Sequence, residues 1–357
     1  MDRRDFVTRT ALASLAFDLT SQGQGKPASQ APRLRPLIFD AMGELRAEYD
    51  ATVIRGMLES GIRAITVTLC DPKPTGAEGL EAAIDGITAY NRLIANNPRA
   101  YQRATKVADI DAARRANRMA VFYLYQNTVQ FGTDLDRIDL FHRLGLRSCQ
   151  LTYNDRNDVG AGCRAEGSLT EFGRAVIERM NRLGMLIDLS HANMPTMADA
   201  IRTSARPVII SHTACMAVHR NVRNTTDENL RLLADKGGLV GICQMRPFLT
   251  TKKTDNLGAY IDHIDHAVKV AGIEHVGIGS DRDHRVIALT PEYVQELKRE
   301  EGAQVVDDEL PYFIEALNGP RRMEVIWSAL EKRGYKSADI ERIMGTNVYR
   351  LYRDIMG

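Results

Sequence analysis

The sequence predicts a (β/α)8 barrel, an α/β fold in which eight parallel strands alternate with helices around a closed core. Eight short apolar runs, each as long as a buried parallel strand, recur along the chain, and amphipathic segments separate them. No glycine-rich phosphate loop follows the first run, which disfavours an open doubly wound sheet. The chain has 357 residues and is 44% hydrophobic, which is enough for one large core.

The predicted strands are the apolar runs at residues 34–39, 63–69, 119–125, 147–153, 185–190, 207–211, 238–243 and 275–280. Two of the intervening helices show the Ser/Thr-x-x-Glu pattern of a capping box, which begins at Ser168 and at Thr225. After the eighth strand, we expect a loop and extra helices over residues 285–335. Residues 337–356 then form a terminal amphipathic helix, which a Gly-Thr-Asn sequence interrupts.

The first 32 residues differ from the rest of the chain. Arg3 and Arg4 precede Phe6, an apolar run covers residues 11–17, and a polar stretch covers residues 21–32. This order is similar to a twin-arginine export signal followed by a flexible linker, so we expect a periplasmic or other extracytoplasmic location. The alternative is a disordered tail with two chance arginines. We expect residues 33–357 to form a single barrel domain.

Composition excludes several classes of partner. Lys and Arg number 47 and Asp and Glu 46, without a long basic run, so nucleic acid is not an expected partner. No apolar run reaches the roughly 18 residues of a membrane span. The five cysteines are odd in number and show no CxxC spacing, which does not support a disulfide framework.

Two predicted strands end in the same dipeptide, Ser-His. His191 ends the sequence MLIDLSH and His212 ends PVIISH, 21 residues later, which is about one strand-plus-helix unit. If the two strands are neighbours, both imidazoles emerge side by side at the carboxyl end of the barrel, where barrel enzymes place their chemistry. One such histidine is more often a structural residue, but the pair predicts a site for zinc or a similar divalent ion.

Further candidate residues follow the first, third, fourth and eighth predicted strands. They are Asp40, Met42, Glu44, Gln126, Asn127, Tyr153, Asn154, Asp281 and Asp283, with Arg220, Arg223 and Asn224 after the sixth strand. A metal at the histidine pair would acidify water and polarise an amide carbonyl. A carboxylate after the eighth strand could transfer the proton to the leaving amine. A nearby arginine could bind a substrate carboxylate through two hydrogen bonds. Of the six other histidines, most are expected on helices or the surface, and His284, which lies close to this site in the sequence, is left open as a site residue.

Five segments resemble the membrane (renal) dipeptidase family of zinc peptidases, which are amidohydrolase-like barrels. They are residues 169–191, 207–212, 223–230, 275–281 and 344–352, and the resemblance extends over residues 36–357. It implies a (β/α)8 barrel that hydrolyses dipeptides with two zinc ions and that forms a homodimer. By this resemblance, His191 and His212 bind one zinc, Arg223 binds the substrate carboxylate, and Asp281 is the acid and base.

The sequence departs from the family pattern at four positions. Met42 and Glu44 stand where the family has the His and Asp of an HxD motif, Gln126 replaces the Glu that bridges the metals, and Tyr153 replaces a substrate-binding His. A neutral amide cannot bridge two cations, and a thioether has little affinity for zinc among oxygen and nitrogen ligands. We therefore expect a divergent bacterial branch with one divalent ion per chain.

The resulting hypothesis is a metallohydrolase that cleaves dipeptides or similar small N-acyl amino acids. His191 and His212 bind the metal, with Glu44 as a weak third ligand, and Asp281 is catalytic. The expected substrate-binding residues are Arg223, Tyr153, Gln126 and Asn154. The alternative is a catalytically silent periplasmic protein that binds a small carboxylate-bearing ligand in the same pocket. A third hypothesis, hydrolysis of a non-peptide amide or lactone, has no feature of its own in the sequence.

Overall fold

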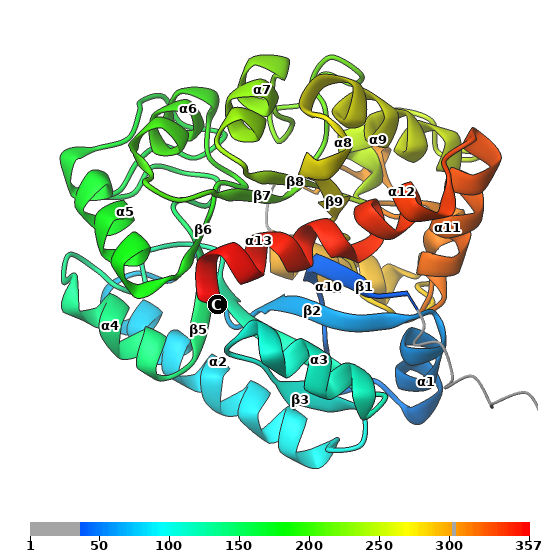
Figure 1. Ribbon diagram of the computed structural model, residues 1–357, viewed down its shortest axis with the longest axis horizontal. Coiled ribbons are helices and arrows are strands. Elements are labelled where there is room, and N and C mark those ends of the chain that lie inside the picture. The colour runs from blue at the N-terminus through cyan, green and yellow to red at the C-terminus, as the bar shows by residue number, and fades with distance from the viewer. Residues whose placement is uncertain (1–35, 302–304) are drawn as a thin grey trace, which may run out of the picture. The chain divides into compact units, whose positions relative to one another are not determined.

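Eight parallel strands close into a barrel in the computed structural model, which describes residues 36–301 and 305–357 (Figure 1). The barrel strands are β1 (Ile38–Gly43), β2 (Ile62–Thr68), β4 (Met119–Tyr125), β5 (Leu146–Gln150), β6 (Leu186–Asp188), β7 (Ile209–Thr213), β8 (Leu239–Ile242) and β9 (Val276–Ile278). Neighbours in the chain pair in order, β2 pairs with β4, and β9 pairs with β1 to close the ring. The predicted (β/α)8 barrel is confirmed.

Two features of the sheet differ from the sequence prediction. The first strand was expected at residues 34–39, but β1 covers Ile38–Gly43 and continues through Asp40. The strand can include this carboxylate because Ser280 donates two hydrogen bonds to it. A short additional strand, β3 (Tyr101–Arg103), pairs with the first three residues of β4 outside the barrel ring. Three residues are too few for a recognisable apolar run.

Helices surround the barrel. They are α1 (Ala51–Glu59), α2 (Gly76–Asn96), α3 (Val107–Arg115), α4 (Asp136–Arg143), α5 (Glu171–Leu183), α6 (Met194–Thr203), α7 (Asp227–Asp235), α8 (Arg246–Leu249), α9 (Leu257–Ala271), α10 (Pro291–Glu301), α11 (Arg322–Arg333), α12 (Ser337–Glu341) and α13 (Asn347–Met356). Short 3-10 turns lie at η1 (Ile273–His275), η3 (Asp307–Glu309) and η4 (Glu315–Leu317). Within the described residues, no helix is both long enough and apolar enough to cross a membrane.

The two predicted capping boxes are wrong, and single threonine N-caps stand in their place. The N-cap of α5 is Thr170 rather than Ser168, and its hydroxyl accepts a hydrogen bond from Gly173 N at 2.9 Å. The N-cap of α7 is Thr226 rather than Thr225. The helix α5 therefore begins two residues later and α7 one residue later than the pattern suggested. Each has a threonine hydroxyl as N-cap but no reciprocal bond from a Glu, because the third helical residues are Gly173 and Asn229. The predicted export signal at residues 1–32 lies outside the described residues.

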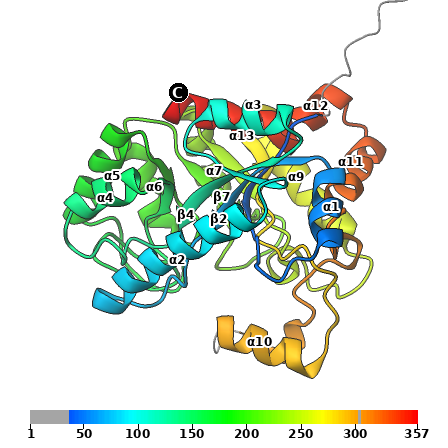
Figure 2. The same cartoon turned by 90° about the horizontal axis from the view of Figure 1, so that it is seen from below.

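The last helix closes the amino-terminal end of the barrel. The aromatic ring of Tyr352 on α13 packs against Phe39 and Phe122 inside the barrel, and its hydroxyl lies 2.6 Å from Thr66 Oγ1. The expected break before this helix is a π-helical turn, η5 (Arg342–Thr346). Figure 2 shows α13 and α10 on opposite sides of the barrel. With the amino end sealed, the carboxyl ends of the strands are left to form a site.

Candidate functional site

A cavity of about 670 Å³ lies at the carboxyl ends of the strands. The predicted site residues that line it are Met42, Glu44, Gln126, Tyr153, Asn154, His191, Arg223 and Asp281. His212 is fully buried and lies behind His191. The barrel thus brings together residues from both halves of the chain, as the positions of the strand ends predict.

The two strand-end histidines face each other through the same ring atom. His191 follows β6, His212 lies in β7, and their Nε2 atoms are 3.0 Å apart. Both side chains are buried, with exposed fractions of 6% and 0%. Because β6 and β7 are neighbours in the barrel, the predicted juxtaposition is present.

Hydrogen bonds at Nδ1 define the tautomer of each imidazole. His191 Nδ1 lies 2.7 Å from Asn154 Oδ1, a carbonyl oxygen that can only accept, so this nitrogen is the donor. His212 Nδ1 lies 2.8 Å from Ser211 Oγ, and that hydroxyl donates its own proton to the carboxylate of Asp188. His212 Nδ1 is therefore also a donor. Both Nε2 atoms carry lone pairs, and the lone pairs point at each other.

Asp188 at the end of β6 holds both Ser-His dipeptides in place. Its carboxylate accepts hydrogen bonds from the backbone N and the hydroxyl of Ser190 and of Ser211. The Ser190 hydroxyl in turn accepts from His212 N at 3.0 Å. One buried carboxylate thus binds the serines of both Ser-His dipeptides. These hydrogen bonds fix the positions of the two histidines that follow the serines.

Burial keeps both imidazoles neutral. Desolvation lowers the pKa of His191 well below its usual value, and the positive charge of Arg223 lowers it further. The same two causes lower the pKa of His212 to about 3, although Asp188 opposes them. A shared proton between the two nitrogens is therefore disfavoured at neutral pH, whereas a divalent cation could accept both lone pairs.

The backbone is strained at two of the predicted site residues. His191 has a φ of 67° and Asp281 a φ of 52°, in the left-handed region that residues with a Cβ rarely adopt. Such strain is typical of functional sites, where neighbouring contacts hold a residue in a costly conformation.

The β9–β1 side of the rim, separated from β7 by the single strand β8, repeats the Asp-Ser arrangement. The buried carboxylate of Asp40 in β1 accepts hydrogen bonds from the backbone N and the hydroxyl of Ser280, as Asp188 does from its serines. Asp281 follows this serine, and its backbone N donates to Met42 O at 2.8 Å. Burial raises the pKa of the Asp281 carboxyl, while Arg223 and Arg282 lower it.

The β1–β4 side offers no second ligand pair. Glu44 is held by Arg46 at 2.7 Å, and burial raises the pKa of its carboxyl. Within residues 36–301 and 305–357, no three His, Cys, Asp or Glu side chains converge closely enough to hold a metal ion. The two neutral imidazoles are the ligand pair that the described residues offer to a divalent ion, while Met42 and Gln126 contribute neither charge nor an imidazole.

The expected substrate-binding residues surround this pair. The Tyr153 ring stacks on His191 with centroids 4.2 Å apart. Arg223 is 7% exposed, and its guanidinium lies 5.3 Å from the Phe248 ring centre. The guanidinium also donates a long hydrogen bond to His212 O at 3.4 Å. No carboxylate of the described residues pairs with it. A buried cation without a counter-ion is suited to an anionic ligand.

Two of the other histidines, His263 and His284, are buried. His263 on α9 is structural, because Nδ1 accepts from Cys215 N and Nε2 donates to Leu249 O. His284 is buried without a hydrogen-bond partner for either ring nitrogen among the described residues, and it does not line the cavity.

Sequence reasoning missed the roles of Asp188 and Ser211. The signal in the sequence that could have indicated them is the charged Asp188 inside the otherwise apolar strand β6.

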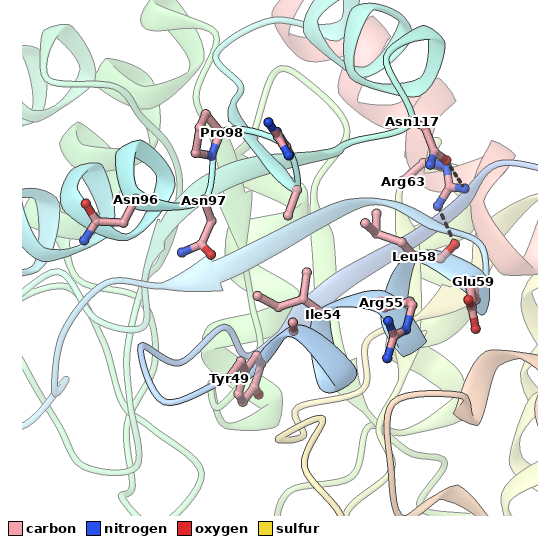
Figure 3. A pocket seen from close by; sticks show the side chains of 13 residues that line it. Tyr49, Ile54, Arg55, Leu58, Glu59, Arg63, Asn96, Asn97, Pro98 and Asn117 are labelled. Atoms are coloured by element: carbon pink, nitrogen blue, oxygen red, sulfur yellow. Dashed lines mark hydrogen bonds between the residues drawn. The ribbon is translucent and has the colours of Figure 1, made fainter.

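A second cavity, of about 720 Å³, lies on the flank of the barrel between α1 and the chain that joins α2 to β3 (Figure 3). Its lining includes Arg63, which donates to Leu58 O at 2.8 Å and to Asn117 Oδ1 at 2.9 Å. These bonds tie the end of α1 to the loop before β4. None of the predicted site residues lines this cavity, so the carboxyl-end cavity is the candidate site.

Comparison with known proteins identifies the family. Residues 40–299 match the model of the membrane dipeptidase family, Peptidase family M19. The chain belongs to the membrane dipeptidase family. The resemblance found in the sequence is thereby confirmed, and membership of a metallopeptidase family implies a divalent metal.

Relatives and solved structures agree with this family. Dipeptidase tcpJ of Claviceps purpurea is 28% identical over 260 residues, which are 71% of this chain and 55% of that protein. The chain spans about half the length of the curated relatives it matches. An amidohydrolase from Pseudomonas aeruginosa superposes with a TM-score of 0.81 at 26% identity, over 90% of this chain and 97% of that one.

A metallo peptidase from Rhodobacter sphaeroides, liganded with a phosphinate mimic of the dipeptide L-Ala-D-Ala, has the same fold. Its TM-score is 0.77 at 20% identity, over 89% of this chain and 99% of that one.

Proposed function

We propose that the protein is a metal-dependent hydrolase that cleaves the amide bond of dipeptides or similar small N-acyl amino acids. The observation that carries the proposal is the pair of neutral imidazoles, whose Nε2 lone pairs face each other at 3.0 Å. Two lone pairs at this separation repel unless a proton or a cation lies between them, and the lowered pKa values disfavour the proton. His191 and His212 would hold one divalent ion, with zinc as the proposed metal.

When bound, such an ion supplies Lewis acidity to the amide carbonyl and acidifies a water molecule. Asp281 is the proposed proton carrier, because it lines the cavity and its backbone is fixed by the bond to Met42 O. Its carboxylate would take the proton of the attacking water and deliver it to the leaving amine. A raised pKa suits this role, since the group must release the proton as readily as it accepts it.

Arg223 is the proposed binding group for the C-terminal carboxylate of the substrate. Its guanidinium is buried beside Phe248 and is not neutralised by a carboxylate within the described residues, so a substrate carboxylate would fill that role. A charge-assisted bond of this kind is stronger where water is excluded. Tyr153 holds the plane of His191 by stacking, and Asn154 fixes its tautomer. Gln126 lines the cavity as a neutral polar group.

The proposal extends to location and assembly. Export by the twin-arginine route, to the periplasm, rests on residues 1–32, and a homodimer rests on the family resemblance. Glu44 lines the cavity and pairs with Arg46, and among the described residues it does not converge with the two histidines. Its proposed role as a weak metal ligand therefore requires the Glu44–Arg46 ion pair to open.

The test combines metal content with activity. Protein dialysed against trace zinc is analysed by mass spectrometry and then assayed on a panel of dipeptides. We expect one equivalent of zinc per chain and hydrolysis of at least one dipeptide, both lost in His191→Ala. The control is His219→Ala, which removes an imidazole outside the cavity lining and should change neither result.

Three other outcomes would contradict parts of the proposal. Two equivalents of zinc would mean that Glu44 and Gln126 help to bind a second ion. Metal without hydrolysis of any dipeptide would exclude the peptidase activity. Neither metal nor turnover, together with binding of dipeptides, would favour the silent binding protein.

A further inference from the structure

Arg164 is a second arginine in the candidate cavity. It lies in the loop between β5 and α5, lines the 670 Å³ cavity, and has an exposed side chain. Within the described part of the chain, its guanidinium makes neither a hydrogen bond nor an ion pair. The side chain of an exposed arginine is usually solvated by water and makes no lasting contact, so exposure alone does not indicate a binding role for Arg164.

The backbone at Arg164 is fixed to the metal-site residues. Arg164 N donates to Asn154 O at 2.9 Å, and the preceding Cys163 N donates to His191 O at 2.7 Å. An isolated bridge between Gly162 and Ala192 continues this contact. The Cα of Arg164 therefore has a defined position relative to His191, and only the side chain is free to move. An ordered backbone lowers the entropic cost of using such a side chain in binding.

The two arginines lie on the same side of the cavity. The backbone N of Arg164 is bonded to Asn154, whose side chain is hydrogen-bonded to His191 Nδ1, and the Arg223 guanidinium donates to His212 O at 3.4 Å. Because the Nε2 atoms of His191 and His212 are 3.0 Å apart, both arginines flank the same histidine pair.

The remaining charges that line the cavity already have local partners. Glu44 pairs with Arg46, and Asp71 lies 4.0 Å from Lys73. Glu309 accepts a hydrogen bond from the Tyr312 hydroxyl at 3.3 Å, and Asp281 is assigned to proton transfer. Among the described residues, Arg164 and Arg223 are the lining cations without a carboxylate partner.

We propose that Arg164 binds the side-chain carboxylate of the C-terminal residue of the substrate, so that the enzyme prefers dipeptides ending in Asp or Glu. This inference rests on the proposed function, because it assumes that Arg223 binds the α-carboxylate of the same residue. Two guanidinium groups on one side of a cavity match the two carboxylates of one acidic residue, and each pair can form charge-assisted hydrogen bonds.

The test compares acidic substrates with their uncharged isosteres. kcat/KM is measured for Ala-Glu against Ala-Gln and for Ala-Asp against Ala-Asn, with the zinc-loaded wild type, Arg164→Gln and Arg156→Gln. Arg156 lies in the same loop but outside the cavity lining, which makes it a matched control. We expect the wild type to prefer the acidic member of each pair by about tenfold or more, chiefly through KM.

Arg164→Gln should lose this preference while Arg156→Gln keeps it. An equal loss on acidic and amide substrates, or a wild type without any preference, would overturn the proposal. If no dipeptide is hydrolysed, calorimetric titration of Ala-Glu and Ala-Gln separates the two ideas. Arg164-dependent selectivity in binding would support the role of Arg164 and contradict the hydrolase, whereas the absence of selective binding would contradict the role of Arg164.

Discussion

The β6–β7 side and the β9–β1 side of the barrel rim are built in the same way but present different chemistry. Each has a buried aspartate that binds the backbone N and hydroxyl of a strand-end serine, Asp188 on one side and Asp40 on the other. On the β6–β7 side, the serines precede His191 and His212. On the β9–β1 side, the serine precedes Asp281, and the neighbouring strand presents Met42.

The difference shows that the same Asp-Ser hydrogen-bond arrangement can hold residues with different functions. The Asp188 network continues through Ser211 to His212 Nδ1 and so determines which ring nitrogen carries the lone pair. The Asp40 network joins Ser280 to the backbone of Met42, which in turn accepts a hydrogen bond from Asp281 N, so it positions the Asp281 backbone and reaches neither His191 nor His212. One side therefore controls the protonation of a metal ligand, whereas the other positions a carboxylate.

Asp281→Asn has the largest expected effect, because it removes the one titratable group of the β9–β1 side that we assign to catalysis. Turnover of dipeptides should fall by about 10²- to 10⁴-fold, the usual contribution of a general acid and base. Zinc content should not change. Burial raises the pKa of this carboxyl, so the acidic limb of the wild-type kcat/KM profile should lie above the range of an ordinary aspartate and be absent from the variant. Loss of the metal in Asp281→Asn would show that Asp281 is a ligand instead.

Asp188→Asn compared with Asp40→Asn tests the difference between the two networks directly. An asparagine at 188 can no longer accept every bond from the two serines, so the Ser211 hydroxyl becomes free to donate to His212 Nδ1. The proton then moves to Nε2, and zinc affinity should fall by about 10- to 100-fold in competition with a chelating dye. Asp40→Asn should bind zinc as the wild type does. Equal losses in the two variants would mean that both networks serve general stability only.

The smallest effect is expected from the ionisation of Asp40, which should change the stability of the fold rather than the site. Burial raises its pKa from 3.8 to about 6 in the folded protein. A carboxyl group whose pKa is raised by folding contributes fully to the stability of the folded protein at pH values below its pKa in the unfolded chain. This contribution is lost as the pH rises through about 6, the pKa in the folded protein. The free energy of unfolding of wild type relative to Asp40→Asn should therefore fall by on the order of 1–3 kcal/mol between pH 4 and pH 7, measured by urea titration. A pH-independent difference would contradict a raised pKa at Asp40.

Most of the barrel could be predicted from apolar runs, because strands buried on both faces are apolar at nearly every position. The first strand was placed too early, since Asp40 and Gly43 do not resemble strand residues until Ser280 is known to satisfy the carboxylate. The short β3 was missed because three residues carry too little pattern. The interruption of the terminal helix was visible because Gly345 is a poor helix former.

The juxtaposition of His191 and His212 could be predicted because consecutive parallel strands place equivalent ends side by side. Their tautomers could not, since these depend on Asn154 and Asp188 through side-chain hydrogen bonds that strand pattern does not reveal. Arg164 was also missed. Its significance depends on a loop fold that pins Cys163 to His191, and loop conformation is not encoded in periodicity.

The position of α13 has a consequence for the order of assembly. This helix supplies Tyr352 to the interior of the barrel, where it contacts Phe39 and Phe122 from strands made more than 220 residues earlier. The interior layer is therefore incomplete until residues 347–356 have left the ribosome, and a shorter nascent chain would expose those aromatic rings. The barrel can therefore reach its final packing only after this segment has been synthesised.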